Sequence, residues 1–131
     1  MGIIQNILGK KTEEAVADFF GEKGYWAHIL PKAVIGQPFD IIARRENKVF
    51  FVDAKHLEDK KVSFALSRIE PNQLSAMKYA NMTARIFDNM GFVILWKENF
   101  YFLDYGKVKY MIAKDIKSIK MEELPLLEGF L

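Results

Sequence analysis

Apolar residues recur at three- and four-residue spacing in two segments, which is the spacing of one face of an α-helix. The first segment is residues 12–23, where Thr12 can cap the N-terminus and Gly24 ends the helix. The second segment is residues 72–89, and Gly91 follows it. The pattern therefore predicts two helices.

Shorter apolar runs bounded by turn residues predict strands between and after these helices. Glu46-Asn47 and Lys97-Glu98 supply two short turns, the second of which predicts a hairpin. The segment HLEDKKVS at residues 56–63 is polar and predicts an exposed loop. The predicted strands are residues 25–30, 39–44, 48–55, 92–96 and 99–103.

The order helix, three strands, helix, hairpin predicts an α/β fold with a mixed central sheet flanked by helices. The run VFFV in the third strand is almost continuously apolar, which favours a strand covered on both faces. Residues 108–112 are a further element of unassigned type, and residues 121–124 predict a turn of helix. With 131 residues, the chain fits one domain spanning residues 1–131.

The composition excludes several kinds of site but does not by itself identify the function. The chain has no cysteine and two histidines, which excludes disulfides and thiolate zinc sites and argues against a zinc hydrolase. The net charge of +2 is compatible with an enzyme in which a carboxylate cluster and a basic rim nearly cancel. No run of about 18 apolar residues occurs, and no basic segment precedes the first apolar stretch, so we expect a cytoplasmic protein.

Two acids and a lysine carry the main chemical signal. Asp53 and Lys55 lie two residues apart on one predicted strand and therefore on one face, and the neighbouring strand carries Asp40. Converging carboxylates suit Mg²⁺, and a nearby ammonium suits the charge that develops in phosphodiester hydrolysis. The alternative is an Asp-Lys pair that emerges into solvent at a strand end, because D-x-K is short and common by chance.

The sequence GQPFD, followed after 12 residues by DAK, resembles the PD-(D/E)xK nucleases, with Phe39-Asp40 in place of Pro-Asp. The segments GKKTE, KVSFALSRIEPNQ and GFVILWKENFYFL resemble RecU-type Holliday-junction resolvases in particular. The likeness covers roughly residues 9 to 105. It implies a restriction-endonuclease-like fold and Mg²⁺-dependent cleavage of DNA, with Mn²⁺ as a possible substitute.

The resemblance also implies site roles. Its catalytic residues fall on Glu13, Asp40, Asp53, Lys55 and Gln73, and its metal ligands on Asp40, Asp53 and Glu13. Glu14 is the reserve for the first acid, and either glutamate can instead be a solvated acid in the first turn of a helix. Gln73 would orient water or touch the scissile phosphate, or be a plain amide at a helix start.

Two departures from the resembled family bear on the substrate. Asp53 stands where the family more often has glutamate, which the PD-(D/E)xK pattern allows. The segment between the first helix and Asp40 is too short for the stalk that RecU-type enzymes insert into a four-way junction. Junction specificity therefore stays open, although similar archaeal resolvases also lack a stalk.

Several basic residues are candidates for a DNA track, because phosphate contacts supply most of the affinity in such complexes. Each of them can equally be an ordinary charged surface residue. The candidates for DNA binding are Arg44, Arg45, His56, Lys60, Lys61 and Arg68.

Three functions remain. The first is an endonuclease for four-way or other branched DNA, acting as a homodimer because resolution needs two symmetric cuts. Residues 62–66 and the tail PLLEGFL could supply the dimer interface. The second is a phage or mobile-element DNase or nickase without junction specificity. The third is a DNA-binding module that no longer cuts.

Overall fold

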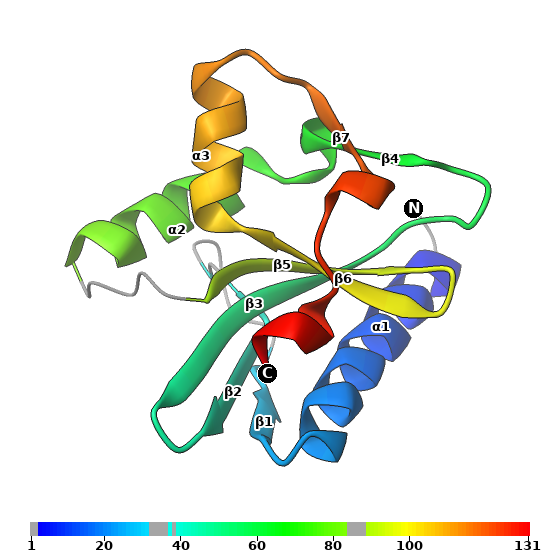
Figure 1. Cartoon of the computed structure of the whole chain (residues 1–131), viewed down its shortest axis with the longest axis vertical. Helices are drawn as coiled ribbons and strands as arrows, with labels where there is room; N and C mark the ends of the chain where they lie inside the picture. Colours follow the sequence, from blue (N-terminus) through cyan, green and yellow to red (C-terminus); the bar gives the residue numbers. More distant parts are fainter. Residues whose placement is uncertain (1–2, 32–36, 38, 84–88) are drawn as a thin grey trace.

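A five-stranded mixed sheet forms the centre of the molecule, in the order β1-β2-β3-β5-β6 (Figure 1). The computed structural model describes residues 3–31, 37, 39–83 and 89–131. Neighbouring strands are antiparallel except β3 and β5, which are parallel. The predicted mixed sheet is confirmed. Its strands are β1 (Trp26–Ile29), β2 (Ile41–Arg45), β3 (Lys48–His56), β5 (Met90–Trp96) and β6 (Asn99–Asp104).

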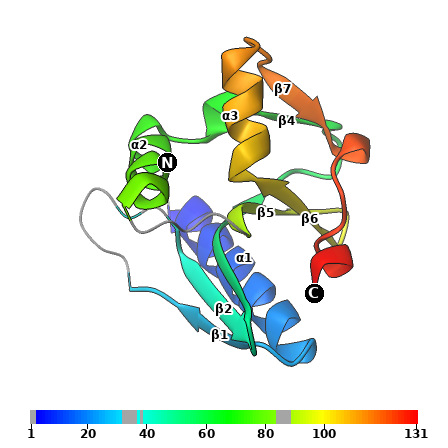
Figure 2. The same ribbon diagram turned by 60° about the vertical axis from the view of Figure 1, so that its left-hand side comes forward.

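Helices cover both faces of this sheet. Helix α1 (Ile3–Glu22) packs on one face, while α2 (Pro71–Thr83) and α3 (Tyr105–Ala113) lie on the other side (Figures 1 and 2). In the part of the chain that the structure describes, no helix is long and apolar enough to cross a membrane.

Strand alternation sorts the buried side chains into two cores. Phe50 and Val52 of β3 pack with Val16 and Phe20 of α1. The intervening positions of β3, which include Asp53, point to the opposite face of the sheet. The predicted polar site therefore lies on the face that α2 and α3 flank.

Helix α1 is longer at its N-terminus than the sequence analysis predicted. It begins at Ile3, so Thr12 lies inside the helix and is 2% exposed, and the predicted capping role of Thr12 is wrong. The sequence IIQNIL before Thr12 already has helical apolar spacing, which extends the helix. The predicted end is confirmed, because Gly24 has φ +86° directly after the last turn.

Gly91 does not end a helix, as the sequence suggested, but lies inside β5. A Cβ at Gly91 would stand 2.4 Å from the Leu103 carbonyl oxygen and 2.7 Å from the Asp104 Cα. Glycine is required there because the backbone at the end of the neighbouring strand β6 lies too close for any side chain. Helix α2 is described as far as Thr83, and residues 84–88 of its predicted span to Asn89 lie outside the described residues; Asn89 itself is in a turn, with φ 62°.

Both predicted turns are confirmed. Lys97 and Glu98 have φ of 49° and 64°, and the register Trp96↔Asn99 closes the β5–β6 hairpin between them. Two consecutive residues with positive φ match the twist of a hairpin, even though neither is glycine or asparagine. The β2–β3 turn contains Glu46 at φ 54°.

The C-terminal third adds elements that the sequence left open. Residues 108–112 belong to α3, whose N-terminus is capped by Asp104, with Oδ1 accepting from the Lys107 backbone N at 2.7 Å. Strand β4 (Ser63–Ala65) pairs with β7 (Ser118–Lys120) in a small second sheet. The predicted turn of helix is confirmed as a 3₁₀ turn at Met121–Glu123.

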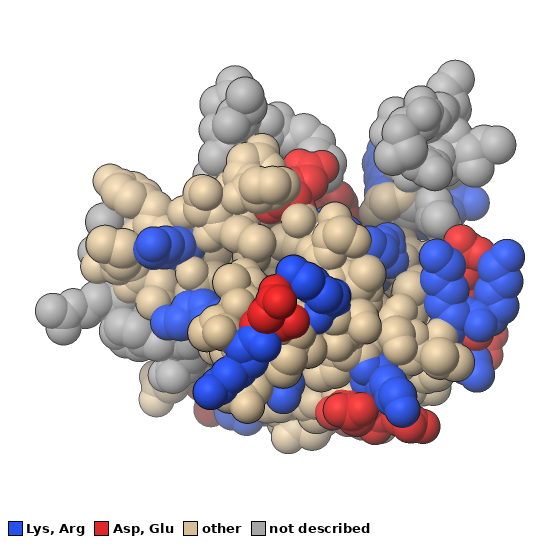
Figure 3. Space-filling model, turned by 90° about the horizontal axis from the view of Figure 1, so that it is seen from above, with Lys and Arg blue, Asp and Glu red and all other residues tan. Residues whose placement is uncertain are grey.

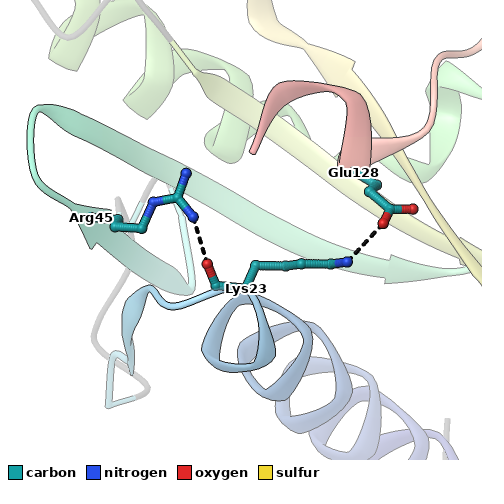
Figure 4. A network of polar contacts seen from close by, with 3 residues as sticks. All are labelled: Lys23, Arg45 and Glu128. Atoms are coloured by element: carbon teal, nitrogen blue, oxygen red, sulfur yellow. Dashed lines mark hydrogen bonds and ion pairs between the residues drawn. The ribbon is translucent and has the colours of Figure 1, made fainter.

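Two segments that were predicted to lie on the surface are partly buried. Leu57, within the predicted exposed loop, is 1% exposed, and Leu127, within the tail PLLEGFL, is fully buried. The tail is also held by an ion pair of 2.7 Å between Lys23 Nζ and Glu128 Oε1 (Figure 4). Part of the tail therefore completes the core of its own chain.

Candidate active site

Three of the predicted site residues form one connected polar cluster. The Lys55 Nζ lies 3.2 Å from Asp53 Oδ2 and donates to Gln73 Oε1, also at 3.2 Å. Asp53 and Lys55 project from β3, and Gln73 lies in the first turn of α2. The strand and the helix thus meet at this lysine.

The cluster is largely removed from solvent. Asp53 is 2% exposed, and the Lys55 side chain is 17% exposed. An ionised carboxylate at such a depth requires a partner, which the ammonium supplies. Asp53 and Gln73 use two of the three N–H donors of Lys55, so the third can meet a further acceptor such as a phosphate oxygen.

Asp40 lies in the bend directly before β2 rather than within the strand, as the sequence had suggested. Its backbone N donates to the Val52 carbonyl at 2.9 Å, and its carbonyl accepts from the Leu30 N at 2.7 Å. Its backbone is therefore held beside the residue that precedes Asp53. The adjoining Phe39 is buried against Phe51, with ring centroids 5.0 Å apart, which anchors the bend.

Of the two candidate acids in α1, only Glu13 is buried, at 7% exposed, whereas Glu14 is exposed. Helix α1 packs on the face of Phe50 and Val52, opposite the face to which Asp53 points. Among the described residues, no three His, Asp or Glu side chains form a group that could hold a metal. The structure therefore does not gather the predicted three-carboxylate set, and the ligand roles stay predictions.

The donors nearest to this cluster nevertheless suit magnesium. They are carboxylate oxygens, and the backbone at Asp40 is bonded to the residue next to Asp53. Proteins often hold Mg²⁺ through one or two carboxylates, with waters and substrate phosphates completing the shell. Two aspartate carboxylates would therefore be enough protein ligands for such an ion.

The predicted DNA-binding residues form two groups, one near each end of β3. At the end near Asp53, His56 is half-buried, and Lys60 pairs with Glu58 at 3.6 Å. The Arg68 guanidinium lies over the Phe64 ring at 5.3 Å. Burial lowers the pKa of Arg68, and the Glu58 carboxylate partly opposes that change. Lys61 is exposed, and its carbonyl accepts the indole N–H of Trp96 at 2.8 Å.

At the other end, the two arginines differ in their surroundings. The Arg44 Nε donates to the Glu46 carbonyl at 3.1 Å. Arg45 donates to the Lys23 carbonyl at 2.7 Å and lies over the Tyr25 ring at 4.7 Å, which ties β2 to the end of α1 (Figure 4). Arg45 thus already has a structural use.

The described surface has no continuous basic band on the face seen from above. Figure 3 shows lysine and arginine side chains interspersed with acidic ones there, among the residues drawn in colour. A DNA track on that face would consist of separate basic contacts. This arrangement agrees with the small net charge of +2.

Sequence reasoning overlooked an exposed aromatic pair on β1. Trp26 is 62% exposed, and its ring lies parallel to that of His28 with centroids 5.6 Å apart. The signal was the alternation in WAHI, which places Trp26 and His28 on one face and Ala27 and Ile29 on the other.

No family model matches the sequence, and no curated protein does. Among solved structures, the fold is similar to the 1.6 Å structure of Archaeoglobus fulgidus Hjc, a Holliday junction resolvase from an archaeal hyperthermophile. The TM-score is 0.63 at 10% sequence identity, and the match covers 93% of each chain. The chain therefore has the mixed α/β fold of that protein over almost its whole length.

Proposed function

We propose that this chain is a metal-dependent endonuclease that cuts branched DNA, with Asp53, Lys55 and Gln73 at its reacting centre. The observation that carries the proposal is the buried contact of Lys55 with both Asp53 and Gln73. Its support is the fold, which is similar over 93% of each chain to a protein described as a Holliday junction resolvase.

The burial of Asp53 argues for a chemical rather than a structural use of the pair. A pair that emerged into solvent would leave the carboxylate exposed, whereas Asp53 is only 2% exposed. Buried ion pairs are weak stabilising devices, since desolvation offsets much of their Coulombic attraction. A pair retained at the end of the apolar run VFFV is therefore better explained by catalysis.

We assign Asp40 and Asp53 as the ligands of Mg²⁺, with Mn²⁺ as a substitute. Glu13 is not assigned as a ligand, because α1 packs on the opposite face of the sheet. When bound, the ion supplies positive charge at the scissile phosphate and lowers the pKa of a coordinated water. The donor set is carboxylate oxygen throughout, which is the ligand type that magnesium prefers.

The remaining residues act on the phosphate and on the attacking water. Lys55 holds its free N–H toward a non-bridging oxygen and stabilises the negative charge that develops there. Gln73 fixes the Lys55 ammonium through Oε1, and its amide N–H₂ can donate to the phosphate or to the water. The cluster thus presents a fixed cation beside the Asp53 carboxylate.

The proposed substrate is a four-way junction or another branched DNA, and the active form is a homodimer that makes two cuts. Within the predicted interface residues 62–66, Val62 is 63% exposed, but Phe64 is buried in the core of its own chain. In the tail, Leu126 is 47% exposed. We expect a dimer at micromolar concentration in size-exclusion chromatography; a strict monomer would argue against junction resolution.

The substrate is tested with synthetic four-way, nicked and linear duplex DNA of shared sequence, incubated with Mg²⁺, Mn²⁺ or a chelator. We expect cleavage of the four-way junction with either metal and none with the chelator. Equal cleavage of linear duplex would instead indicate a DNase without junction specificity. Binding without product in both metals would identify a DNA-binding module that no longer cuts.

A further inference from the structure

The edge strand β1 presents an aromatic pair that has no use in the core. The exposed fraction of Trp26 is 62%, and its ring is parallel to that of His28, with an interplanar angle of 0° and centroids 5.6 Å apart. Large apolar side chains exposed on a sheet edge favour unwanted association, and proteins usually avoid them there. The exposure of these two parallel rings at this position is therefore better explained if they bind a ligand.

The pair lies on the same sheet face as the candidate active site. Trp26 is opposite Arg44, and Arg44 is opposite Val49, whereas His28 aligns through Ile42 with Phe51. Side chains of cross-strand partners share a face. Phe51 precedes Asp53 by two residues, so Trp26, His28 and Asp53 all point to one side of the sheet.

Strand spacing fixes the distance to the reacting centre. With about 4.8 Å between strands and about 3.3 Å per residue, the backbone at His28 lies roughly 12 Å from Asp53 and that at Trp26 roughly 16 Å. A few nucleotides of one DNA strand span such a distance. Figure 2 shows β1 at the margin of the sheet, away from α2 and α3.

A cation accompanies the rings. Arg44 is exposed and directly opposite Trp26 in the register. Its guanidinium donates from Nε to the Glu46 carbonyl, which leaves its other N–H groups for a phosphate. Aromatic faces combined with a nearby cation are the recurring device for holding unpaired nucleotides, because every base has a face that stacks.

We propose that Trp26 and His28, with Arg44 beside them, form a subsite for an unpaired nucleobase of the DNA strand whose phosphate lies at Asp53. The base stacks on the exposed indole, and the adjoining phosphate meets Arg44. The inference rests on the proposed nuclease function and extends it, because it favours DNA that exposes unpaired bases at a branch point over a fully paired duplex. A peptide added to the edge is the less suitable occupant, because β1 offers only four residues for pairing.

Fluorescence tests the subsite without any cleavage. The chain has two tryptophans, and Trp96 is half-buried with its indole N–H bonded to the Lys61 carbonyl, so Trp96→Phe leaves Trp26 as the reporter. In a metal-free buffer, a single-stranded oligothymidylate should quench this emission, and a blunt duplex of equal length should not. Absence of quenching by the single strand at saturation overturns the proposal.

Affinity measurements supply the matched variants. Trp26→Ala should weaken binding of the oligothymidylate by about tenfold, with duplex binding unchanged. Trp26→Phe should retain most of the affinity. The control Tyr110→Ala removes another exposed aromatic, on α3, which also has a lysine over its ring, and should change nothing. The proposal is overturned if Trp26→Ala binds the oligothymidylate as tightly as the wild type. It is also overturned if Trp26→Ala changes the oligomeric state of the protein, because Trp26 would then belong to a protein–protein interface.

The two proposals fail in distinguishable ways. If the wild-type protein cuts no branched DNA but quenching and the tenfold loss are observed, the nuclease assignment falls and the subsite stands as a binding site. If the wild-type protein cuts and Trp26→Ala binds single strands as tightly as wild type, the subsite falls and the nuclease stands.

Discussion

At the scale of single residues, the fold places one lysine between two oxygen acceptors from different elements. Period-two alternation along β3 predicts that Asp53 and Lys55 share a face, and the 3.2 Å contact shows that they do. The contact with Gln73 depends on where α2 packs, which no local pattern encodes. The bend at Asp40 was missed for a similar reason, because its backbone bonds reach Val52 in β3 and Leu30 directly after β1.

The stability of the buried pair should depend on which partner is removed. Lys55→Ala leaves a 2% exposed carboxylate without its cation and should lower the free energy of unfolding by about 3 kcal/mol. Asp53→Asn should lower the free energy of unfolding by less, because the Lys55 side chain that it leaves unpaired is 17% exposed and can be solvated by water. Urea denaturation measures both, and the double variant should recover part of the loss of Lys55→Ala. Equal, additive losses would contradict the pairing.

Gln73 should act as a positioning residue through Lys55. Gln73→Ala should lower kcat for junction cleavage by about tenfold with little change in KM, because a loosened ammonium stabilises the transition state less well. Gln73→Glu keeps an oxygen acceptor for Lys55 but loses the amide N–H₂, so activity above that of Gln73→Ala would assign the effect to positioning of Lys55, and activity below it would assign the effect to donation by the amide. A loss confined to KM would show that Gln73 only binds DNA.

At the scale of elements, sequence patterns predicted all five strands of the main sheet but mistook several boundaries. Glycine after a long helix is typical of a helix end, yet Gly91 lies inside β5, where the backbone at the end of β6 leaves no room for a side chain. Residues 108–112 alternate too briefly to decide between strand and helix, and the Asp104 cap that begins α3 was the overlooked signal. Strands β4 and β7 are three residues each, too short for periodicity to detect.

The close approach of the β6 backbone to Gly91 gives a prediction at this scale. Gly91→Ala places a Cβ within 2.4 Å of a backbone oxygen, and neither strand can yield easily, so we expect a loss of about 3 kcal/mol. The matched control is Gly9→Ala in α1, where nothing lies within 4 Å of the new methyl group. This control should raise stability by about 0.5–1 kcal/mol. Thermal unfolding distinguishes them; a neutral Gly91→Ala would mean that the hairpin is not tightly held.

At the scale of the whole molecule, the α/β fold that the sequence order predicted is present, and it is shared with Archaeoglobus fulgidus Hjc at a TM-score of 0.63. The order of helices and strands could be predicted because helical and strand periodicity encode it locally. That order does not require a similar sequence, since the two chains are only 10% identical. The contact of α2 with the end of β3 depends on tertiary packing, which local sequence patterns do not predict. That contact holds the cluster on which the nuclease proposal depends.

The most direct measurement of that proposal is Mg²⁺-dependent cleavage of a synthetic four-way junction by the wild-type protein and by Asp53→Asn, with binding of the same junction measured in parallel. The account predicts cleavage by the wild type, a rate at least about a hundredfold lower for Asp53→Asn, and similar binding by both. Cleavage by a folded Asp53→Asn at the wild-type rate would contradict it.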